Sequence, residues 1–295
     1  MTRVLFLVNP RSGQVAEEGL DAVRNGLRSV LKKDASPEFL SASVPELREA
    51  ARTAKTDFVA SVGGDGTIGA VAGVLAGRSD APCFVPLPFG TANLIPRDLG
   101  MPMDPVAALE MSLAATSREV DYATANGAPL LHSAVFGTFA EVAEERERAR
   151  EAHDLGERLA ALGAATGALF GTRPQDYHLV IDGKPLDATT NTVFVTNNAI
   201  TGGHRGVPQR ARLDSGHLVA YVSDSRSPFG FIQRIIEAGT RGFERSDGIT
   251  RHLCRRVVVS GEGALTYSRD GEVEETDEVV FEAVPGALRV PDLRG

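Results

Sequence analysis

The chain has 295 residues, more than one hydrophobic core of ordinary size requires, so one large domain or two modest ones are expected. Hydrophobic residues make up 42% and charged residues 24%, which is typical of a folded globular protein. The net charge of −8, the absence of tryptophan and an aromatic content of 6% argue against a nucleic-acid-binding protein, because such proteins need clustered basic residues and aromatic stacking platforms.

The cysteines and the apolar segments predict a cytoplasmic protein. Cys83 and Cys254 lie far apart in the sequence, so they favour neither a disulfide framework nor a four-ligand zinc site and suit a reducing compartment. The N-terminus lacks the long apolar core of a signal peptide. The longest weakly polar stretch, 159–172, is too short to cross a bilayer. We therefore expect peripheral contact with the inner membrane surface and no nucleic-acid partner, and a homo-oligomer is left open.

The first part of the chain alternates strand-like and helical patterns. Repeated β–α units of this kind imply a parallel sheet with helices on both faces, and we predict an α/β domain over residues 1–122. Short apolar runs predict strands at 4–8, 39–40, 58–62 and 83–87, and apolar residues at helical spacing predict helices at 15–33, 45–54, 68–77 and 104–115.

The pattern changes near residues 121–125, and strand signals dominate the remainder. One long helix or two are predicted over 141–170, with a leucine stripe that suits either interdomain core or membrane contact. Asp182-Gly183 indicates a hairpin turn. We predict an antiparallel β domain over 123–295 and leave open whether its last residues return to the first domain. The stripe consists of Leu155, Leu159, Leu162 and Leu169, and the strands are predicted at 177–181, 192–196, 217–222, 257–260, 264–268 and 279–283.

Three loops that contain glycine follow three of the predicted strands. They are Asn9-Pro-Arg-Ser-Gly13, Gly63-Gly-Asp-Gly-Thr67 and Pro88-Phe-Gly-Thr-Ala-Asn93. Because open parallel sheets bind ligands at the carboxyl ends of their strands, we expect all three loops at one edge of the sheet. Neither the Walker A pattern nor the Gly-x-Gly-x-x-Gly pattern occurs at these strand ends, which disfavours P-loop NTPases and Rossmann dehydrogenases.

The loop at Gly63–Thr67 is the strongest indication of nucleotide chemistry. Its glycines let backbone N–H groups approach an oxyanion closely, and the helix that follows directs its positive end at the same point. A carboxylate in such a loop repels phosphate unless it orients a metal ion or a hydroxyl, so Asp65 indicates Mg²⁺–nucleotide chemistry. Gly90 and Thr91 can approach phosphate or ribose. The alternative for each loop is a plain turn, with Asp65 as a helix N-cap.

In this order the three loops resemble the diacylglycerol kinase catalytic-domain family, which includes diacylglycerol, sphingosine and bacterial lipid kinases. The similarity covers almost the whole chain. The resemblance implies an N-terminal parallel-sheet nucleotide domain, like that of NAD kinase and phosphofructokinase, a C-terminal antiparallel β-sandwich domain, and an active site between them. The similarity continues through Val120-Asp121, 132–137, Gly202-Gly203, 208–216, Asp270-Gly-Glu272 and 285–290.

The resemblance also implies an ATP-dependent lipid kinase of phospholipid biosynthesis. Such an enzyme transfers the γ-phosphoryl group of ATP·Mg²⁺ to a hydroxyl of a diacylglycerol-like or sphingoid lipid. The implied nucleotide contacts are Asn9, Ser12, Gly13, Ser41, Gly63, Gly64, Asp65, Gly66, Thr67, Gly90 and Thr91, and they extend to Ala70.

The family places its proton acceptor in the turn that matches Asp270-Gly271-Glu272. We expect Asp270, supported by Glu272, to be the general base, and we expect repulsion between the two carboxylates to raise the pKa of one of them. A metal–water network of the bacterial members matches Asp65, Asp121, Arg212, Asp214, Ser215 and His217.

Several positions depart from the family pattern. Gly69 and Ala70 stand where Asn and Glu are common, the third loop continues as Leu94-Ile-Pro96, and Ser215 replaces an acidic metal ligand. These changes are compatible with phosphate binding and leave the acceptor open. Two other functions also stay open. One is an NAD kinase-like or other small-molecule kinase, which shares the Gly-Gly-Asp loop, and the other is a catalytically weak nucleotide- or lipid-binding protein.

Overall fold

The structure, a computed structural model, describes residues 2–137, 174–204, 207–223 and 248–293. The chain divides into two compact units. The first consists of Met1–Tyr122 together with Val284–Gly295, and the second of Ala123–Ala283. The helical prediction over 141–170 and its leucine stripe lie outside the described residues.

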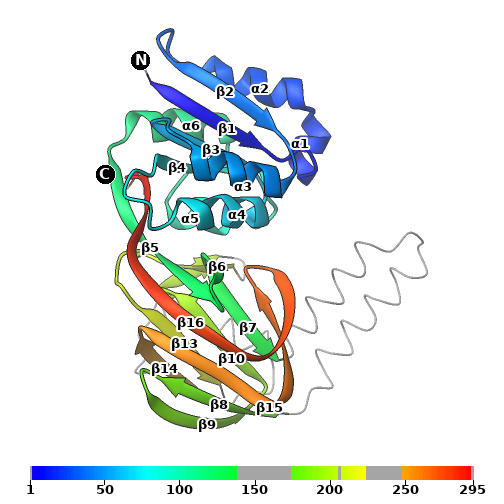
Figure 1. Cartoon of the computed structure of the whole chain (residues 1–295), viewed down its shortest axis with the longest axis vertical. Coiled ribbons are helices and arrows are strands. Elements are labelled where there is room, and N and C mark those ends of the chain that lie inside the picture. Colours follow the sequence, from blue (N-terminus) through cyan, green and yellow to red (C-terminus); the bar gives the residue numbers. More distant parts are fainter. Residues whose placement is uncertain (1, 138–173, 205–206, 224–247, 294–295) are drawn as a thin grey trace, which may run out of the picture. The chain divides into compact units, whose positions relative to one another are not determined.

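The first unit is built on a parallel sheet of four strands in the order β2-β1-β3-β4 (Figure 1). The central strands are continuous apolar runs, which is typical of parallel strands buried on both faces. Every residue of β1 after Arg3 is buried, and every residue of β4 is buried. The strands are β1 (Arg3–Val8), β2 (Ser36–Ser41), β3 (Phe58–Gly63) and β4 (Cys83–Pro88).

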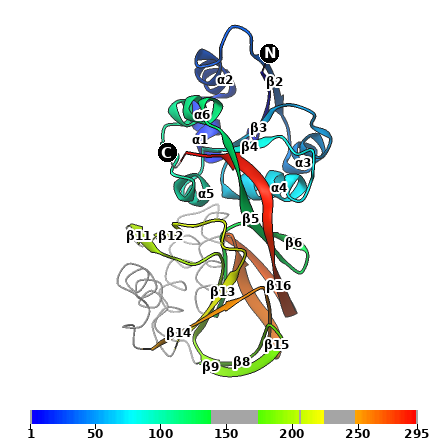
Figure 2. The same ribbon diagram turned by 90° about the vertical axis from the view of Figure 1, so that its left-hand side faces the viewer.

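Helices cover both faces of this sheet, as predicted. Figure 2 shows α1, α2 and α6 on one face and α3 and α4 on the other. The prediction of one helix over 15–33 was wrong, because the chain breaks at Gly19, whose φ of 84° ends α1 before α2 begins. The helices are α1 (Gly13–Glu18), α2 (Leu20–Ser29), α3 (Val44–Thr53), α4 (Asp65–Leu75), α5 (Leu94–Asp98) and α6 (Pro105–Ala114).

The second unit is a large antiparallel sheet with the path β14-β13-β10-β7-β15-β16-β5-β6, and β8 and β9 branch from β15. Two strands, β5 and β16, contribute residues to both units. A short separate pair is formed by β11 and β12. The strands are β5 (Ser117–Ala125), β6 (Ala128–Leu130), β7 (Ser133–Gly137), β8 (Gln175–Ile181), β9 (Lys184–Thr190), β10 (Thr192–Asn197), β11 (Gly202–His204), β12 (Val207–Gln209), β13 (Leu218–Ser223), β14 (Ile249–Cys254), β15 (Arg256–Arg269) and β16 (Glu272–Pro291).

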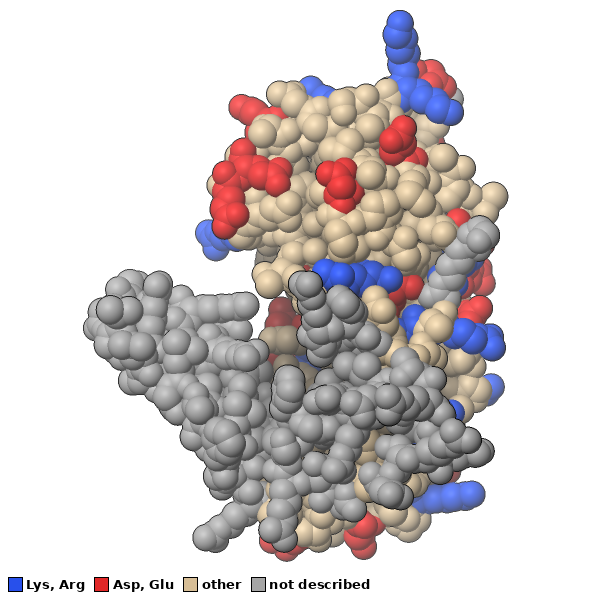
Figure 3. Space-filling model, turned by 180° about the vertical axis from the view of Figure 1, so that it is seen from behind, with Lys and Arg blue, Asp and Glu red and all other residues tan. Residues whose placement is uncertain are grey.

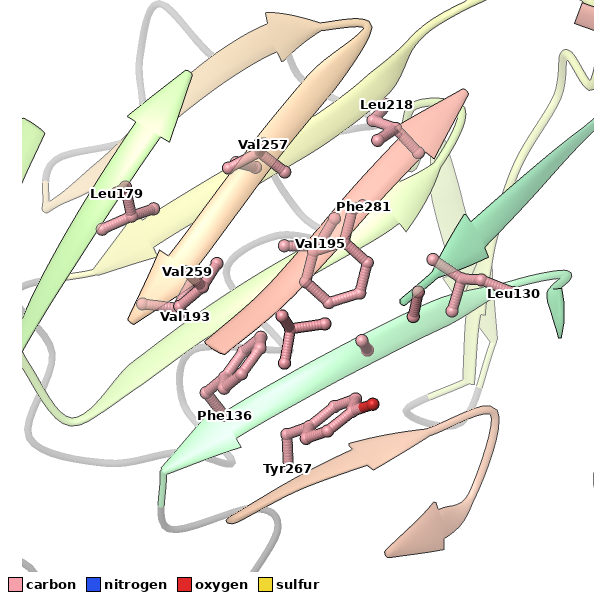
Figure 4. Packing of buried hydrophobic residues seen from close by; sticks show 14 of the residues in the cluster. Leu130, Phe136, Leu179, Val193, Val195, Leu218, Val257, Val259, Tyr267 and Phe281 are labelled. Carbon is pink, nitrogen blue, oxygen red and sulfur yellow. The ribbon is translucent and has the colours of Figure 1, made fainter. Parts of the chain in front are cut away.

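The core of the second unit is filled by aromatic and β-branched side chains from several strands (Figure 4). The rings of Phe136 and Tyr267 are stacked with centroids 5.1 Å apart, and Phe281 packs edge-on against Phe136 at 5.9 Å. Such aromatic pairs add about 0.5–1.5 kcal/mol beyond the area that they bury. The stacked pair joins β7 to β15, the strand that leads into the Asp270 turn.

Two sequence predictions in the second unit, one for a turn and one for a pair of strands, have different outcomes. Asp182-Gly183 connects β8 to β9, and both residues have positive φ, as the predicted tight turn requires. The strands predicted at 257–260 and 264–268 form one strand, β15, with a register shift between Ser260 and Leu265. One strand with a local irregularity therefore replaces the two predicted strands.

The described surface is compatible with the acidic composition. On the face of the first unit that Figure 3 shows, acidic side chains are scattered over a mostly uncharged surface. None of the described helices combines the length and the apolar character needed to cross a bilayer.

Candidate active site

The three glycine loops follow β1, β3 and β4 at the carboxyl edge of the parallel sheet. In the strand order β2-β1-β3-β4, the connection after β1 leads toward β2 and the connection after β3 leads toward β4. The chain therefore diverges on either side of the β1–β3 pair. Open parallel sheets bind ligands at such a switch point.

Hydrogen bonds join the first loop to the other two. The Asn9 side-chain amide donates to Thr67 Oγ1 at 2.9 Å, and the Asn9 backbone N–H donates to the Val62 carbonyl at 2.9 Å. The Ser12 hydroxyl donates to the Phe89 carbonyl at 3.2 Å. Asn9 and Ser12, which were predicted as nucleotide contacts, therefore connect the first loop to the second and third loops.

Asp65 joins the second loop to the third. It is the first residue of α4, and its carboxylate accepts the backbone N–H groups of Asn93 (3.1 Å) and Leu94 (2.8 Å) at the start of α5. The carboxylate thus stabilises the positive end of α5 and fixes the third loop. The sequence pattern predicted that Asp65 is a metal ligand or the N-cap of α4, and it did not indicate this contact with the third loop.

Close packing explains two of the glycines. A Cβ on Gly90 would lie 3.0 Å from Gly64 Cα and 3.0 Å from Asn93 Oδ1, so a side chain at this position would push the two loops apart. The Gly90 N–H donates to the same Asn93 oxygen at 2.7 Å. A Cβ on Gly63 would lie 2.8 Å from Thr67.

The N-terminus of α4 faces the loop junction without a side-chain cap among the described residues. The first bond of the turn runs from the Ile68 N–H to the Gly64 carbonyl at 3.0 Å. In the first turn of an α-helix the backbone N–H groups have no partner inside the helix. The N–H groups of Asp65, Gly66 and Thr67 are therefore suited to bind an anion. Gly13 is the first residue of α1, and its N-cap residue Ser12 likewise makes no side-chain capping hydrogen bond. Thr91 lies in the third loop, and Ser41 ends the edge strand β2.

Asp270 and Gly271 form the tight turn between β15 and β16. Both have positive φ, 49° and 96°, and Arg269 pairs with Glu272 across the turn. The Asp270 carboxylate accepts the backbone N–H groups of Leu131, His132 and Ser133 at 2.7, 2.9 and 2.9 Å. It therefore fastens the turn to the segment between β6 and β7.

The environments of the two acidic residues in the turn differ. Burial is the largest cause of the raised pKa of Asp270, and its three amide partners and Arg210 oppose that rise. Repulsion from a second carboxylate, which we expected, is not the main cause. Glu272 has a side chain that is 65% exposed and an Oε2 atom 3.7 Å from Arg269 Nη2. Glu272 is thus accessible, while Asp270 is engaged by backbone amides.

The residues predicted for a metal site are engaged mainly with the protein. Asp121 Oδ1 accepts the Gly286 N–H at 3.0 Å within the first unit. Asp214 Oδ1 lies 3.1 Å from Arg212 Nε, and the Ser215 N–H donates to Asn198 Oδ1 at 3.0 Å. His217 Nδ1 contacts the Ser215 carbonyl. In the described parts of the chain, no three His, Cys, Asp or Glu residues converge in a way that suits a metal ion.

Three structurally important residues were missed as site residues in the sequence. Asn93 is the N-cap residue of α5, lies in the left-handed region (φ 51°) and accepts the Gly90 N–H. Asn198, with φ 69°, accepts the Ser215 N–H, and the positive charge of the buried Arg210 acts on Asp270. Asn at positive φ is a recognisable turn preference, but its partners become apparent only in the fold.

Comparison with known proteins assigns the chain to a family. Residues 3–125 match the family model of the diacylglycerol kinase catalytic domain, and residues 134–291 match that of the YegS C-terminal NAD kinase beta sandwich-like domain. The chain belongs to this diacylglycerol kinase family and is a phosphotransferase of the lipid-kinase type.

Relatives and solved structures agree with this assignment. The chain is 32% identical over 237 residues to a Pseudomonas aeruginosa protein named "Probable lipid kinase YegS-like", covering 77% of this chain and 74% of the relative. It is 25% identical over 289 residues to the diacylglycerol kinase of Bacillus subtilis, covering 92% and 90%. A diacylglycerol kinase structure from Bacillus anthracis superposes with a TM-score of 0.68 at 21% identity, covering 98% and 96%, which supports the fold.

Proposed function

We propose that the protein is an ATP-dependent lipid kinase that phosphorylates a hydroxyl of a diacylglycerol-like or sphingoid lipid at a membrane surface. The names of the relatives support a lipid acceptor. The observation that carries the proposal is the junction of the three glycine loops, where Asp65, Asn9 and Ser12 connect the loops beside the uncapped N-terminus of α4.

The loop junction supplies the phosphate-binding part of the site. Backbone N–H groups at the start of α4 bind phosphate oxygens, and the helix dipole favours their negative charge. Gly64 and Gly90 let the phosphates approach the backbone, because neither carries a side chain. Thr91 and Ser41 provide hydroxyls at the same edge of the sheet for the rest of the nucleotide.

The reaction forms one bond and breaks another. The lipid hydroxyl oxygen bonds to the γ-phosphorus of ATP while the bond from that phosphorus to the β–γ bridging oxygen breaks, and ADP leaves. The hydroxyl proton passes to a carboxylate, for which we propose Glu272, because its side chain is exposed and Asp270 already accepts three backbone N–H groups. Asp270 then acts as the anchor of the turn.

The chain's residues fit Mg²⁺ at only one of the two predicted places. Each Asp65 oxygen accepts one N–H, which leaves lone pairs for a metal-bound water, so Asp65 can help to hold Mg²⁺ with the nucleotide. Bound there, Mg²⁺ supplies charge neutralisation to the phosphates. The 212–217 segment does not fit a metal site, because Arg212 pairs with Asp214 and Ser215 binds Asn198.

An acceptor panel tests the proposal. Purified protein is given ATP with diacylglycerol, a sphingoid base, NAD or no acceptor, and ADP formation is measured. We expect ADP formation that depends on one of the lipids and is reduced in Glu272→Gln. ADP formation with NAD alone would support the small-molecule kinase. Nucleotide binding with no acceptor-dependent turnover would support the binding-protein alternative.

A further inference from the structure

A buried arginine of the second unit ties two backbone segments together beside the Asp270 turn. Arg210 follows β12 and is 2% exposed. Its Nη1 atom donates to the carbonyl oxygens of Leu131 at 2.7 Å and Asn197 at 2.6 Å. Burial of a guanidinium is unfavourable unless acceptors and an opposite charge compensate it, so this position is specifically stabilised.

The opposite charge is reached through a single peptide group. The carbonyl of Leu131 accepts Arg210, and the N–H of His132, which belongs to the same peptide, donates to Asp270 Oδ1 at 2.9 Å. The peptide dipole therefore lies between a cation and a carboxylate, an arrangement in which successive hydrogen bonds strengthen one another. Asn197 continues the contacts, since its N–H donates to the His132 carbonyl at 3.0 Å.

We propose that Arg210 is a positioning residue for phosphoryl transfer: through the Leu131–His132 peptide it holds the Asp270 carboxylate, and thereby the turn that presents Glu272. The proposal rests on the proposed function for its catalytic consequence. Arg210 reaches no reacting atom in this scheme. It acts on the orientation of the turn, so its loss should affect turnover and leave ATP binding by the first unit's loops unchanged.

The charges around Asp270 predict how its ionisation responds. Burial raises the pKa of Asp270, and the positive charge of Arg210 lowers it. Only the ionised carboxylate accepts all three amides, so turnover should fall as the pH drops through this pKa. Without Arg210 the pKa rises further, and the acid limb of the kcat profile moves to higher pH. The other charged or titratable groups beside Asp270 are Arg269 on β15, Glu272 on β16 and His132 between β6 and β7.

The test compares Arg210→Met with a matched control in the first unit. Arg78, which follows the C-terminal end of α4, also donates to two backbone carbonyls. They belong to Ala51 (2.9 Å) and Ala54 (3.1 Å). Both substitutions remove a guanidinium from two acceptors, so both should lower the melting temperature. Arg210→Met alone should lower kcat, by about 10²-fold for a turn displaced by about 1 Å, with an unchanged KM for ATP and a shifted acid limb.

Amide hydrogen exchange gives a readout independent of activity. The N–H groups of Leu131, His132 and Ser133 should exchange faster in Arg210→Met than in Arg78→Met. Arg210→Lys, which keeps the charge without the planar fork, should restore the acid limb and part of kcat, and it serves as the test variant if Arg210→Met does not fold. Unchanged exchange and kcat in both Arg210 variants would overturn the proposal. If the unaltered protein phosphorylates no acceptor, the proposed function fails, while exchange still decides the role of Arg210.

Discussion

Gly90→Ala tests the loop junction at its tightest point. The new Cβ would lie 3.0 Å from Gly64 Cα, a backbone atom that cannot rotate away, and 3.2 Å from Asp65 Oδ2. The second and third loops must then separate by a few tenths of an ångström. Overpacking of this kind costs about 1–3 kcal/mol, and misplaced binding groups reduce kcat/KM by up to about 10²-fold.

The assay combines ATP titration by calorimetry with kcat/KM for the best acceptor of the panel. Gly26→Ala is the control. Gly26 lies in α2 and belongs to none of the three loops, and its Cβ would meet Val106 Cγ2 of α6 at an ordinary contact distance of 3.5 Å. We expect weaker ATP binding and lower kcat/KM only in Gly90→Ala. A folded Gly90→Ala protein with undiminished ATP affinity would refute the assignment of the junction as the phosphate site.

Three further predictions concern Asp65, the Asp270–Glu272 turn and membrane association. Asp65→Ala should abolish transfer and also lower the free energy of unfolding by about 2 kcal/mol, because two backbone N–H groups lose a charged acceptor; a thermal melt and the kinase assay check both, and wild-type activity would contradict it. Glu272→Gln should reduce kcat by about 10²–10⁴-fold with an unchanged melting temperature. Asp270→Asn should lower both kcat and the melting temperature. If the two variants behave alike, the assignment of Glu272 as proton acceptor and Asp270 as anchor of the turn is wrong. Association with liposomes in flotation should survive rising salt, because a net charge of −8 gives little attraction to anionic lipid; complete release by moderate salt would reject apolar contact.

Much of the first unit could be predicted because its signals are local. Apolar runs such as Val4–Val8 are typical of buried parallel strands, and the glycine loops follow directly from them. The partners of Asp65 could not be predicted, because Asn93 and Leu94 reach its carboxylate only after β3 and β4 pair and Asn93 adopts a positive φ. The carboxylate of Asp65 in a phosphate-binding loop suggested a metal ligand. The sequence pattern did not indicate its hydrogen bonds to the backbone of the third loop.

The Asp270 turn shows the same limit over a longer distance. Asp-Gly between two strands predicts a tight hairpin, which the structure has. The amides that donate to the Asp270 carboxylate come from Leu131, His132 and Ser133, far away in the sequence, and the nearby positive charge comes from Arg210. Side-chain exposure, which distinguishes Glu272 from Asp270, depends on this tertiary packing and not on the motif.

Transfer of label from ATP is the direct test of lipid kinase activity in this protein. ATP that carries ¹⁸O in its γ-phosphoryl group is incubated with the protein and a mixture of diacylglycerol, sphingoid lipid and NAD, and the products are analysed by mass spectrometry. We expect a lipid that has gained one phosphoryl group bearing the label, with an equal amount of ADP, and slower formation of that product in Gly90→Ala. Label found only in inorganic phosphate or in a phosphorylated dinucleotide would contradict this expectation.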